Sequence, residues 1–157
     1  MSTDRPDISV QAEPFDITAE IDALTRGRAD VGAVATFTGL CRDEGGKLAA
    51  LELEHYPGMA DAEIARVVDE AKTRWPLTGV RVIHRHGKIA PGDQIVLVVT
   101  ASAHRQAAFD AANFLMDYLK TRAPFWKKEH LADGTEAGWV AAKDADDQAA
   151  DRWSASG

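Results

Sequence analysis

Residues 80–101 read VRVIHRHGKIAPGDQIVLVVTA, and this stretch decides the fold that the sequence predicts. Residues 80–89 and 94–101 are rich in β-branched residues and predict two strands, joined by a turn at residues 90–93 that contains Pro-Gly. Residues 94–101 form a nearly continuous apolar run, which is typical of a strand at the centre of a sheet. The apolar spacing that follows predicts a helix of about five turns, with Ser102 as its N-cap.

Around this stretch, helix and strand patterns alternate along the chain. The expected segments are an extended lead-in at residues 1–13, a helix from Asp16 or Thr18 to Gly27, a largely buried strand at 31–38, a loop at 39–46, a half-buried strand at 48–55, an amphipathic helix at 60–75, a strand pair at 125–131 and 138–142, and a short helix at 144–153. This order predicts an α+β fold with a mainly antiparallel or mixed sheet. The chain has the length of one ordinary domain, so we expect residues 1–157 to form a single domain with a tail at 144–157.

Charge and composition exclude several classes of protein. The net charge of −7 argues against general binding to nucleic acid or to anionic membranes. No stretch approaches the roughly 18 apolar residues that a membrane-spanning helix needs, and the N-terminus lacks the pattern of a secretory signal. The single cysteine, Cys41, rules out an internal disulfide and favours a reducing compartment, so we expect a cytoplasmic protein. No glycine-rich loop follows an expected strand, which excludes the Rossmann and P-loop classes.

Basic residues are concentrated in one part of this acidic chain. Residues 1–30 carry three Arg and seven Asp or Glu, a net charge of −4, whereas residues 104–130 carry five Lys or Arg and three Asp or Glu, a net charge of +2. A basic segment in an acidic chain favours a small, confined anionic ligand over a long polyanion.

Lys120 and Lys127 are the leading candidates for a functional site. Lys120 falls in the last turn of the expected helix, where exposed carbonyl groups favour a cation. Pro124 then turns the chain into a strand on which Phe125, Lys127 and Glu129 share one face. The two lysines can therefore face one pocket from two elements. Lysines are also common at helix ends and on edge strands without any function, and the spacing alone leaves this alternative open.

Three further basic residues are candidates for binding an anion. His104 and Arg105 follow the central strand at the start of the next helix, where free N–H groups favour a negative charge, although solvation of a helix start explains them equally well. Arg42 lies in a glycine-containing loop after an expected strand, and by itself it is weak support for a site.

Cysteine and histidine offer two other kinds of chemistry. Cys41 lacks a neighbouring histidine motif, and packing is a commoner role for a lone cysteine than nucleophilic catalysis. His84 and His86 share one face of an expected strand and could chelate a metal ion, but no further ligand has suitable spacing. The pattern therefore favours structural roles for both histidines.

Four blocks of sequence form an ordered pattern. They are TFTG at 36–39 with Arg42 shortly after, LEHYPGM at 53–59, VIHR at 82–85 with PGD at 91–93 and SAHR at 102–105, and the stretch from Met116 to Lys127. This pattern resembles the large, catalytic subunit of molybdopterin synthase. The resemblance spans about residues 14–153, and its long, ordered motifs make it far more specific than one short pattern.

The resemblance implies a fold, a reaction and partners. The implied fold is of the α/β hammerhead type with a small extra β subdomain. The implied assembly is a dimer of large subunits, each binding one small ubiquitin-like sulfur carrier, which gives a heterotetramer. The carrier's Gly-Gly tail, as a thiocarboxylate, supplies two sulfurs to the anionic cyclic pyranopterin monophosphate and so forms the dithiolene of molybdopterin. No metal or other cofactor is implied at this step.

The same resemblance implies roles for individual residues. Lys120 and Lys127 match the essential lysines of the family, and the implied substrate-binding set is Leu40, Cys41, Arg42, His104, Arg105, Lys120, Lys127, Lys128 and Glu129. A basic residue is common in the family at the position of Leu40, so the side chain of Leu40 departs from the pattern. A contact through the backbone at this position is compatible with the departure.

Two other functions are compatible with the same basic residues. A subunit that docks the carrier but performs no chemistry would lose carrier affinity and activity together when the lysines are replaced. An unrelated phosphate-ester hydrolase would release phosphate from generic esters without any carrier. The resemblance favours the sulfur transferase, because it covers the motifs as well as the fold pattern.

Overall fold

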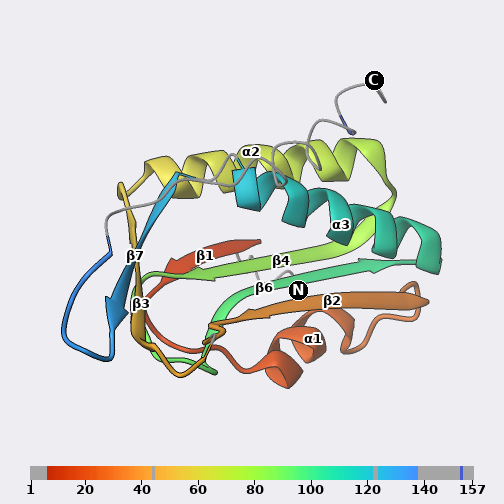
Figure 1. Cartoon of the computed structure of the whole chain (residues 1–157). Coiled ribbons are helices and arrows are strands. Elements are labelled where there is room, and N and C mark those ends of the chain that lie inside the picture. Colours follow the sequence, from red (N-terminus) through yellow and green to blue (C-terminus); the bar gives the residue numbers. More distant parts are fainter. Residues whose placement is uncertain (1–6, 44, 122–123, 138–152, 154–157) are drawn as a thin grey trace.

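The apolar stretch at residues 94–101 lies inside the main sheet, as its composition predicts. A computed structural model describes residues 7–43, 45–121, 124–137 and 153, and in it a four-stranded sheet has the order β1 (Ile8–Gln11), β4 (Leu77–Arg85), β6 (Gln94–Ser102) and β2 (Ala33–Leu40) (Figure 1). β4 and β2 each pair antiparallel with β6, and β1 pairs parallel with β4. The sheet is therefore mixed, with β6 as an internal strand.

A smaller sheet packs at one end of the main sheet. It is antiparallel and has the order β5 (Gly87–Ile89), β3 (Leu48–His55) and β7 (Phe125–Leu131). In the described residues the helices are α1 (Ile17–Thr25), α2 (Met59–Arg74) and α3 (Arg105–Thr121). These elements confirm the expected α+β class, with a mixed sheet and a small additional β unit.

The main sheet separates two apolar cores. α2 and α3 cover one face and α1 covers the other (Figure 1). Because side chains alternate along a strand, Val96 and Val98 of β6 pack beneath α2 and α3, while Leu97 and Val99 pack beneath α1. This two-sided burial explains why β6 reads as a continuous apolar run rather than an alternating one.

The expected single strand at residues 80–89 is wrong, because the chain leaves the main sheet in the middle of it. β4 ends at Arg85, and Gly87 has a φ of 90°, a left-handed conformation that favours glycine. The following β5 pairs with β3 through Leu51 and Ile89. The Pro-Gly turn therefore joins β5 to β6, so the two sheets share one continuous stretch of chain.

Two segments near the N-terminus also differ from expectation. The lead-in at residues 1–13 contains β1, whose Ile8 pairs with Val82 of β4. β2 continues through Leu40 into the expected loop, and it is an edge strand rather than a largely buried one. Its Phe37 and Leu40 are 41% and 55% exposed, which leaves an apolar strand edge open to a partner.

The expected N-cap of α3 is also wrong. Ser102 is the last residue of β6, is buried, and donates a hydrogen bond from Oγ to the carbonyl of Pro76 at 3.0 Å. α3 begins three residues later at Arg105. The hydroxyl of Ser102 thus links β6 to the turn before β4.

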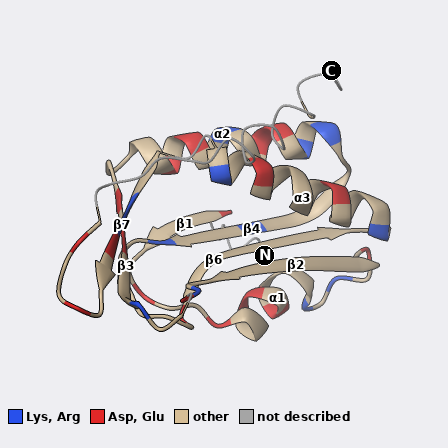
Figure 2. Cartoon of the chain, viewed as in Figure 1, with Lys and Arg blue, Asp and Glu red and all other residues tan. Residues whose placement is uncertain are grey.

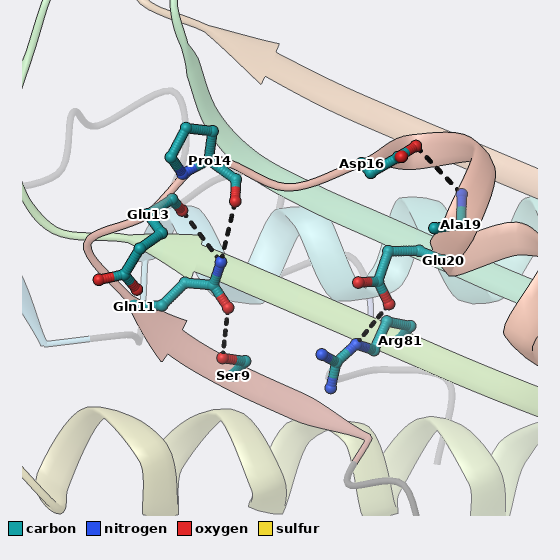
Figure 3. Close-up of polar contacts among 8 residues, drawn as sticks. All are labelled: Ser9, Gln11, Glu13, Pro14, Asp16, Ala19, Glu20 and Arg81. Atoms are coloured by element: carbon teal, nitrogen blue, oxygen red, sulfur yellow. Dashed lines mark hydrogen bonds and ion pairs between the residues drawn. The ribbon is translucent and has the colours of Figure 1, made fainter.

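Polar contacts attach α1 and the N-terminal segment to the main sheet (Figure 3). Asp16 is the N-cap of α1, as expected, and its Oδ1 accepts from the amide of Ala19 at 3.1 Å. Glu20 and Arg81 form a buried ion pair of 2.9 Å between α1 and β4. The amide of Gln11 donates to the backbone carbonyls that follow β1, which fixes the turn into α1.

The C-terminal expectations can be compared with the structure only in part. β7 at Phe125–Leu131 confirms the strand expected there, and a turn follows at Gly134, which has a φ of 90°. The strand expected at 138–142 and most of the helix expected at 144–153 lie outside the described residues. Across the described helices, none combines the length and apolar character needed to cross a membrane.

Candidate functional site

Lys120 and Lys127 lie on either side of the junction between α3 and β7. Lys120 is the next-to-last residue of α3 and is exposed at the helix end where the dipole favours a cation. Lys127 is the third residue of β7 and pairs in register with Leu53 of β3. The chain needs only a few residues to pass from one lysine to the other, so both side chains belong to one end of the molecule.

The two faces of β7 separate the basic residues that follow one another in sequence. Lys127 and Glu129 lie opposite Leu53 and Leu51, whereas Lys128 lies opposite Glu52 on the other face. Lys128 Nζ forms an ion pair of 3.2 Å with Glu136, and this contact lowers the pKa of the Glu136 carboxyl. Lys127 therefore faces the main body of the protein, and Lys128 faces the turn after β7.

The loop after β2 is anchored by its cysteine. Cys41 is 3% exposed and packs with Leu53 and Ile89. Its backbone N–H donates to Asp93 at 2.8 Å and its carbonyl accepts from Gly92 at 2.6 Å. Burial, together with the charge of Asp93, raises the pKa of the thiol, so the side chain suits packing rather than nucleophilic attack.

This anchor directs the neighbouring residues outward. Leu40 is 55% exposed and Arg42 is exposed, while Cys41 between them points into the core. The same Leu53 that packs against Cys41 is the cross-strand partner of Lys127. The structure therefore places the loop that carries Arg42 on the same side of the molecule as Lys127.

His104 and Arg105 lie at the other end of α3. Arg105 is its first residue and Lys120 lies fifteen positions later, which corresponds to about 22 Å along the helix axis. In Figure 2 the basic residues of α3 occupy its two ends. Within one chain, the loop that carries Arg42 lies on the same side of the molecule as Lys127, whereas His104 and Arg105 lie at the opposite end of α3 from Lys120.

An aromatic cluster of His55, His84, His86 and Phe125 adjoins Lys127, and of these the sequence singled out only His84 and His86. The ring of His84 stacks on Phe125, with centroids 3.8 Å apart and planes 13° from parallel. His55 contacts both Phe125 and His86, at 5.9 Å and 4.5 Å between centroids. Across the described residues, no three His, Cys, Asp or Glu side chains are grouped to hold a metal ion.

The charge state of this cluster is set by burial. Burial, with smaller contributions from the charges of Lys127, His55 and His86, lowers the pKa of His84 to about 4. The pKa of His86 is also lowered, chiefly by burial and then by His55. His84 is therefore neutral at physiological pH beside a lysine that carries a positive charge.

Exposed apolar side chains form two groups around the site. Tyr56, Met59 and Trp126 come together where β3, α2 and β7 meet, and the rings of Tyr56 and Trp126 are 5.4 Å apart. We call this group the aromatic surface patch. The second group, which we call the edge patch, comprises Phe37 and Leu40 of the edge strand β2 with Phe109 of α3, a helix that contacts β2, whereas exposed Val34 lies on the sheet face opposite to Phe37.

A hollow of about 190 Å³ lies between α2 and α3, and none of the candidate site residues lines it. It is lined by Arg66, Val67, Glu70, Arg74, Phe114 and Tyr118. Arg66 and Arg74 form ion pairs with Glu63 and Glu70. The nearby Trp153 packs its ring against Trp75 and Phe114, so this region holds the side chain of Trp153.

The fold and the site define an α+β protein with a mixed main sheet, a small antiparallel sheet and basic residues at the junction of α3 and β7. Residues 10–122 match the model of the MoaE protein family. The chain is 71% identical over 151 residues to the molybdopterin synthase catalytic subunit of Mesorhizobium japonicum, covering 96% of this chain and 95% of that protein. The corresponding subunit of Escherichia coli is 52% identical over 148 residues, which cover 93% and 97% of the two chains.

Solved structures show the same similarity. The molybdopterin biosynthesis MoaE protein from Burkholderia ambifaria matches with a TM-score of 0.81 and 46% identity, covering 96% of this chain and 99% of that one. A molybdopterin synthase from Staphylococcus aureus matches with a TM-score of 0.76 and 32% identity, covering 85% and 98%. The chain belongs to the family of molybdopterin synthase catalytic subunits, enzymes of molybdenum cofactor biosynthesis.

Proposed function

We propose that this chain transfers sulfur from the C-terminal thiocarboxylate of a small ubiquitin-like carrier to cyclic pyranopterin monophosphate, in the cytoplasm. The observation that carries the proposal is the basic junction of α3 and β7, where Lys120 and Lys127 lie, with the loop that carries Arg42 on the same side of the molecule as Lys127. Both reactants are anions, and holding two anions together costs electrostatic energy unless cations surround them. The basic junction supplies those cations on a chain whose net charge is −7.

The lysines also suit the chemical steps. When the thiocarboxylate sulfur attacks a carbon of the substrate, a C–S bond forms, the phosphate ester opens, and the leaving oxygen gains negative charge. A positioned ammonium group stabilises that charge or donates a proton to it. Water then cleaves the acyl–sulfur bond, which leaves sulfur on the substrate and a carboxylate on the carrier. We assign Lys120 to the carbonyl of the carrier tail and Lys127 to the substrate phosphate.

The carrier itself requires a surface beside the basic junction. The aromatic surface patch fits this need, because Trp126 precedes Lys127 in β7 and contacts Tyr56. Exposed aromatic and methionine side chains are enriched at protein interfaces. A structure from Helicobacter pylori with the same fold, 18% identical, is described as a complex of subunits 1 and 2 of molybdopterin-converting factor.

A second copy of the chain would complete the substrate site. β2 begins beside Ser102, two residues before His104, and ends two residues before Arg42. Antiparallel pairing of two β2 edges about a two-fold axis therefore places His104 and Arg105 of the partner near Arg42 and the lysines. The edge patch supplies the apolar contact for such a dimer. With one carrier on each copy, the assembly is a heterotetramer.

Replacing the lysines tests the chemistry. Lys120→Ala and Lys127→Ala should each lower dithiolene formation by about 100-fold or more, with thiocarboxylated carrier and cyclic pyranopterin monophosphate, because charge stabilisation is lost. Lys88→Ala is a matched control, since Lys88 is exposed on the same small sheet and pairs with Glu52 on the opposite face. Near-normal turnover in both lysine variants would refute the assignment.

Mixing two inactive variants tests the second copy. Arg105→Ala and Lys127→Ala chains, refolded together in equal amounts, should regain about one quarter of the wild-type activity, because half of the dimers are mixed and each has one intact site. Each variant alone should stay inactive. A mixture as inactive as its components would contradict a site shared between copies.

A further inference from the structure

Four rings from separate segments meet beneath the start of β7. His55 ends β3, His84 lies in β4, His86 follows β4, and Phe125 is the first residue of β7. His55 and Phe125 are also cross-strand partners in the small sheet, whereas His84 belongs to the main sheet. The stack of His84 on Phe125 is thus a contact between the two sheets, at the point where β7 begins.

The ring of His84 is held in one orientation and one charge state. Its Nδ1 lies 2.9 Å from the carbonyl oxygen of Arg85. Because a carbonyl can only accept a hydrogen bond, Nδ1 carries the proton and donates it. The side chain is 8% exposed, and this buried position favours a neutral ring. The backbone contact fixes the plane of the His84 ring, and the near-parallel stack holds the ring of Phe125 almost parallel to it.

Phe125 connects this stack to Lys127. Residues two apart on a strand share a face, so the side chains of Phe125 and Lys127 project in the same direction from β7. The charge of Lys127 also contributes to the lowered pKa of His84, as expected for a cation on the strand face that carries Phe125. A change in the position of Phe125 therefore moves the base of the Lys127 side chain.

We propose that His84 is a positioning residue for Lys127: its buried, backbone-anchored ring fixes Phe125 and the first residues of β7, and so holds the Lys127 ammonium at the proposed anion site. This inference rests on the proposed role of Lys127. A positively charged side chain in place of His84 would place a second cation close to the ammonium group of Lys127. A small one would remove the surface on which Phe125 rests.

Two substitutions separate positioning from simple packing. His84→Ala should slow the first turnover of sulfur transfer by about 10- to 100-fold at saturating carrier and substrate, because displacements of about 1 Å have effects of this size. The affinity for the carrier should change less than the rate, because Tyr56 and Met59 of the aromatic surface patch lie outside β7. His84→Phe loses the hydrogen bond to the carbonyl of Arg85 but keeps a flat ring against Phe125, so it should restore the rate to within about threefold and not completely.

A core variant far from Lys127 tests whether general destabilisation alone slows the first turnover. Val99→Ala removes volume from the core beneath α1, on the other side of the sheet, and should leave the first-turnover rate unchanged. The inference is overturned if His84→Ala transfers sulfur at the wild-type rate, if His84→Phe is as slow as His84→Ala, or if Val99→Ala is equally slow. Recovery by His84→Phe with a normal Val99→Ala supports it.

Failure of the proposed function would look different. A wild-type protein that forms no dithiolene would refute the sulfur-transfer proposal, whatever His84 does. The position of Lys127 can still be followed without turnover, through its side-chain NMR signal in ¹³C-lysine-labelled protein, assigned with Lys127→Arg. His84→Ala should shift that signal and Val99→Ala should not. An unshifted signal in His84→Ala would overturn the positioning role.

Discussion

His84 makes the stability of the folded chain depend on pH in a defined direction. Its pKa falls from the usual 6.5 to about 4 in the folded state, mainly because of burial. The unfolded chain therefore binds a proton that the folded chain resists, and stability falls as the pH drops from 6.5 toward 4. At about 1.4 kcal/mol per pKa unit, the complete loss is about 3 kcal/mol. At pH 5 the loss is about 2 kcal/mol relative to pH 7.5.

Urea unfolding of wild type and His84→Phe at both pH values isolates this contribution. The variant cannot titrate at this position, so it should lose about 2 kcal/mol less than wild type between pH 7.5 and pH 5. Other groups, including His86 with its lowered pKa, change in both proteins and largely cancel in the comparison. Equal losses in the two proteins would refute the reasoning, because they would mean that the ring of His84 accepts a proton without cost in the folded state.

Three further substitutions test contacts of the fold by urea unfolding. Glu20→Ala removes the carboxylate that binds buried Arg81 and should cost about 3 kcal/mol, whereas a loss below about 1 kcal/mol would show that the pair contributes little. Leu97→Ala leaves a cavity beneath α1 at a residue that is 0% exposed and should cost about 3 kcal/mol; full stability would mean that the core closes around it. Gly32→Ala would bring a Cβ to 2.1 Å from the carbonyl oxygen of Ala103, next to His104, and should cost about 1–3 kcal/mol. An unchanged midpoint for Gly32→Ala would mean that the start of α3 moves freely.

Local patterns in the sequence predicted the elements that depend on local physics. The apolar run of β6, the capping of α1 by Asp16 and the strand after Pro124 all match the structure. Each of these follows from residues close together in the chain. The patterns failed where distant pairing decides, as at Gly87, where the chain changes sheets, and at Phe37, where a β-branched strand lies at an edge.

In the candidate site, too, the features set by nearby residues were predicted, and those set by contacts between distant residues were not. The position of Lys120 at a helix end and of Lys127 on the following strand could be read from spacing. The distance between Lys120 and Arg105 also follows from helix geometry, whereas the resemblance implies one substrate-binding set that contains both residues and does not indicate which copy supplies each. The contact of His84 with Phe125 joins residues that are 41 positions apart and lie in different sheets, so no periodic pattern in the sequence predicts it.

The single cysteine offers an internal reporter for the loop that carries Arg42. Cys41 is the only thiol in the chain, and its burial keeps it from reacting with a disulfide reagent while the loop is closed. The rate of thiol labelling under native conditions therefore measures how often the connection between β2 and β3 opens, without any engineered probe. An anion or a carrier that stabilises the closed loop would slow that labelling, so its occupancy can be followed at one native sulfur atom.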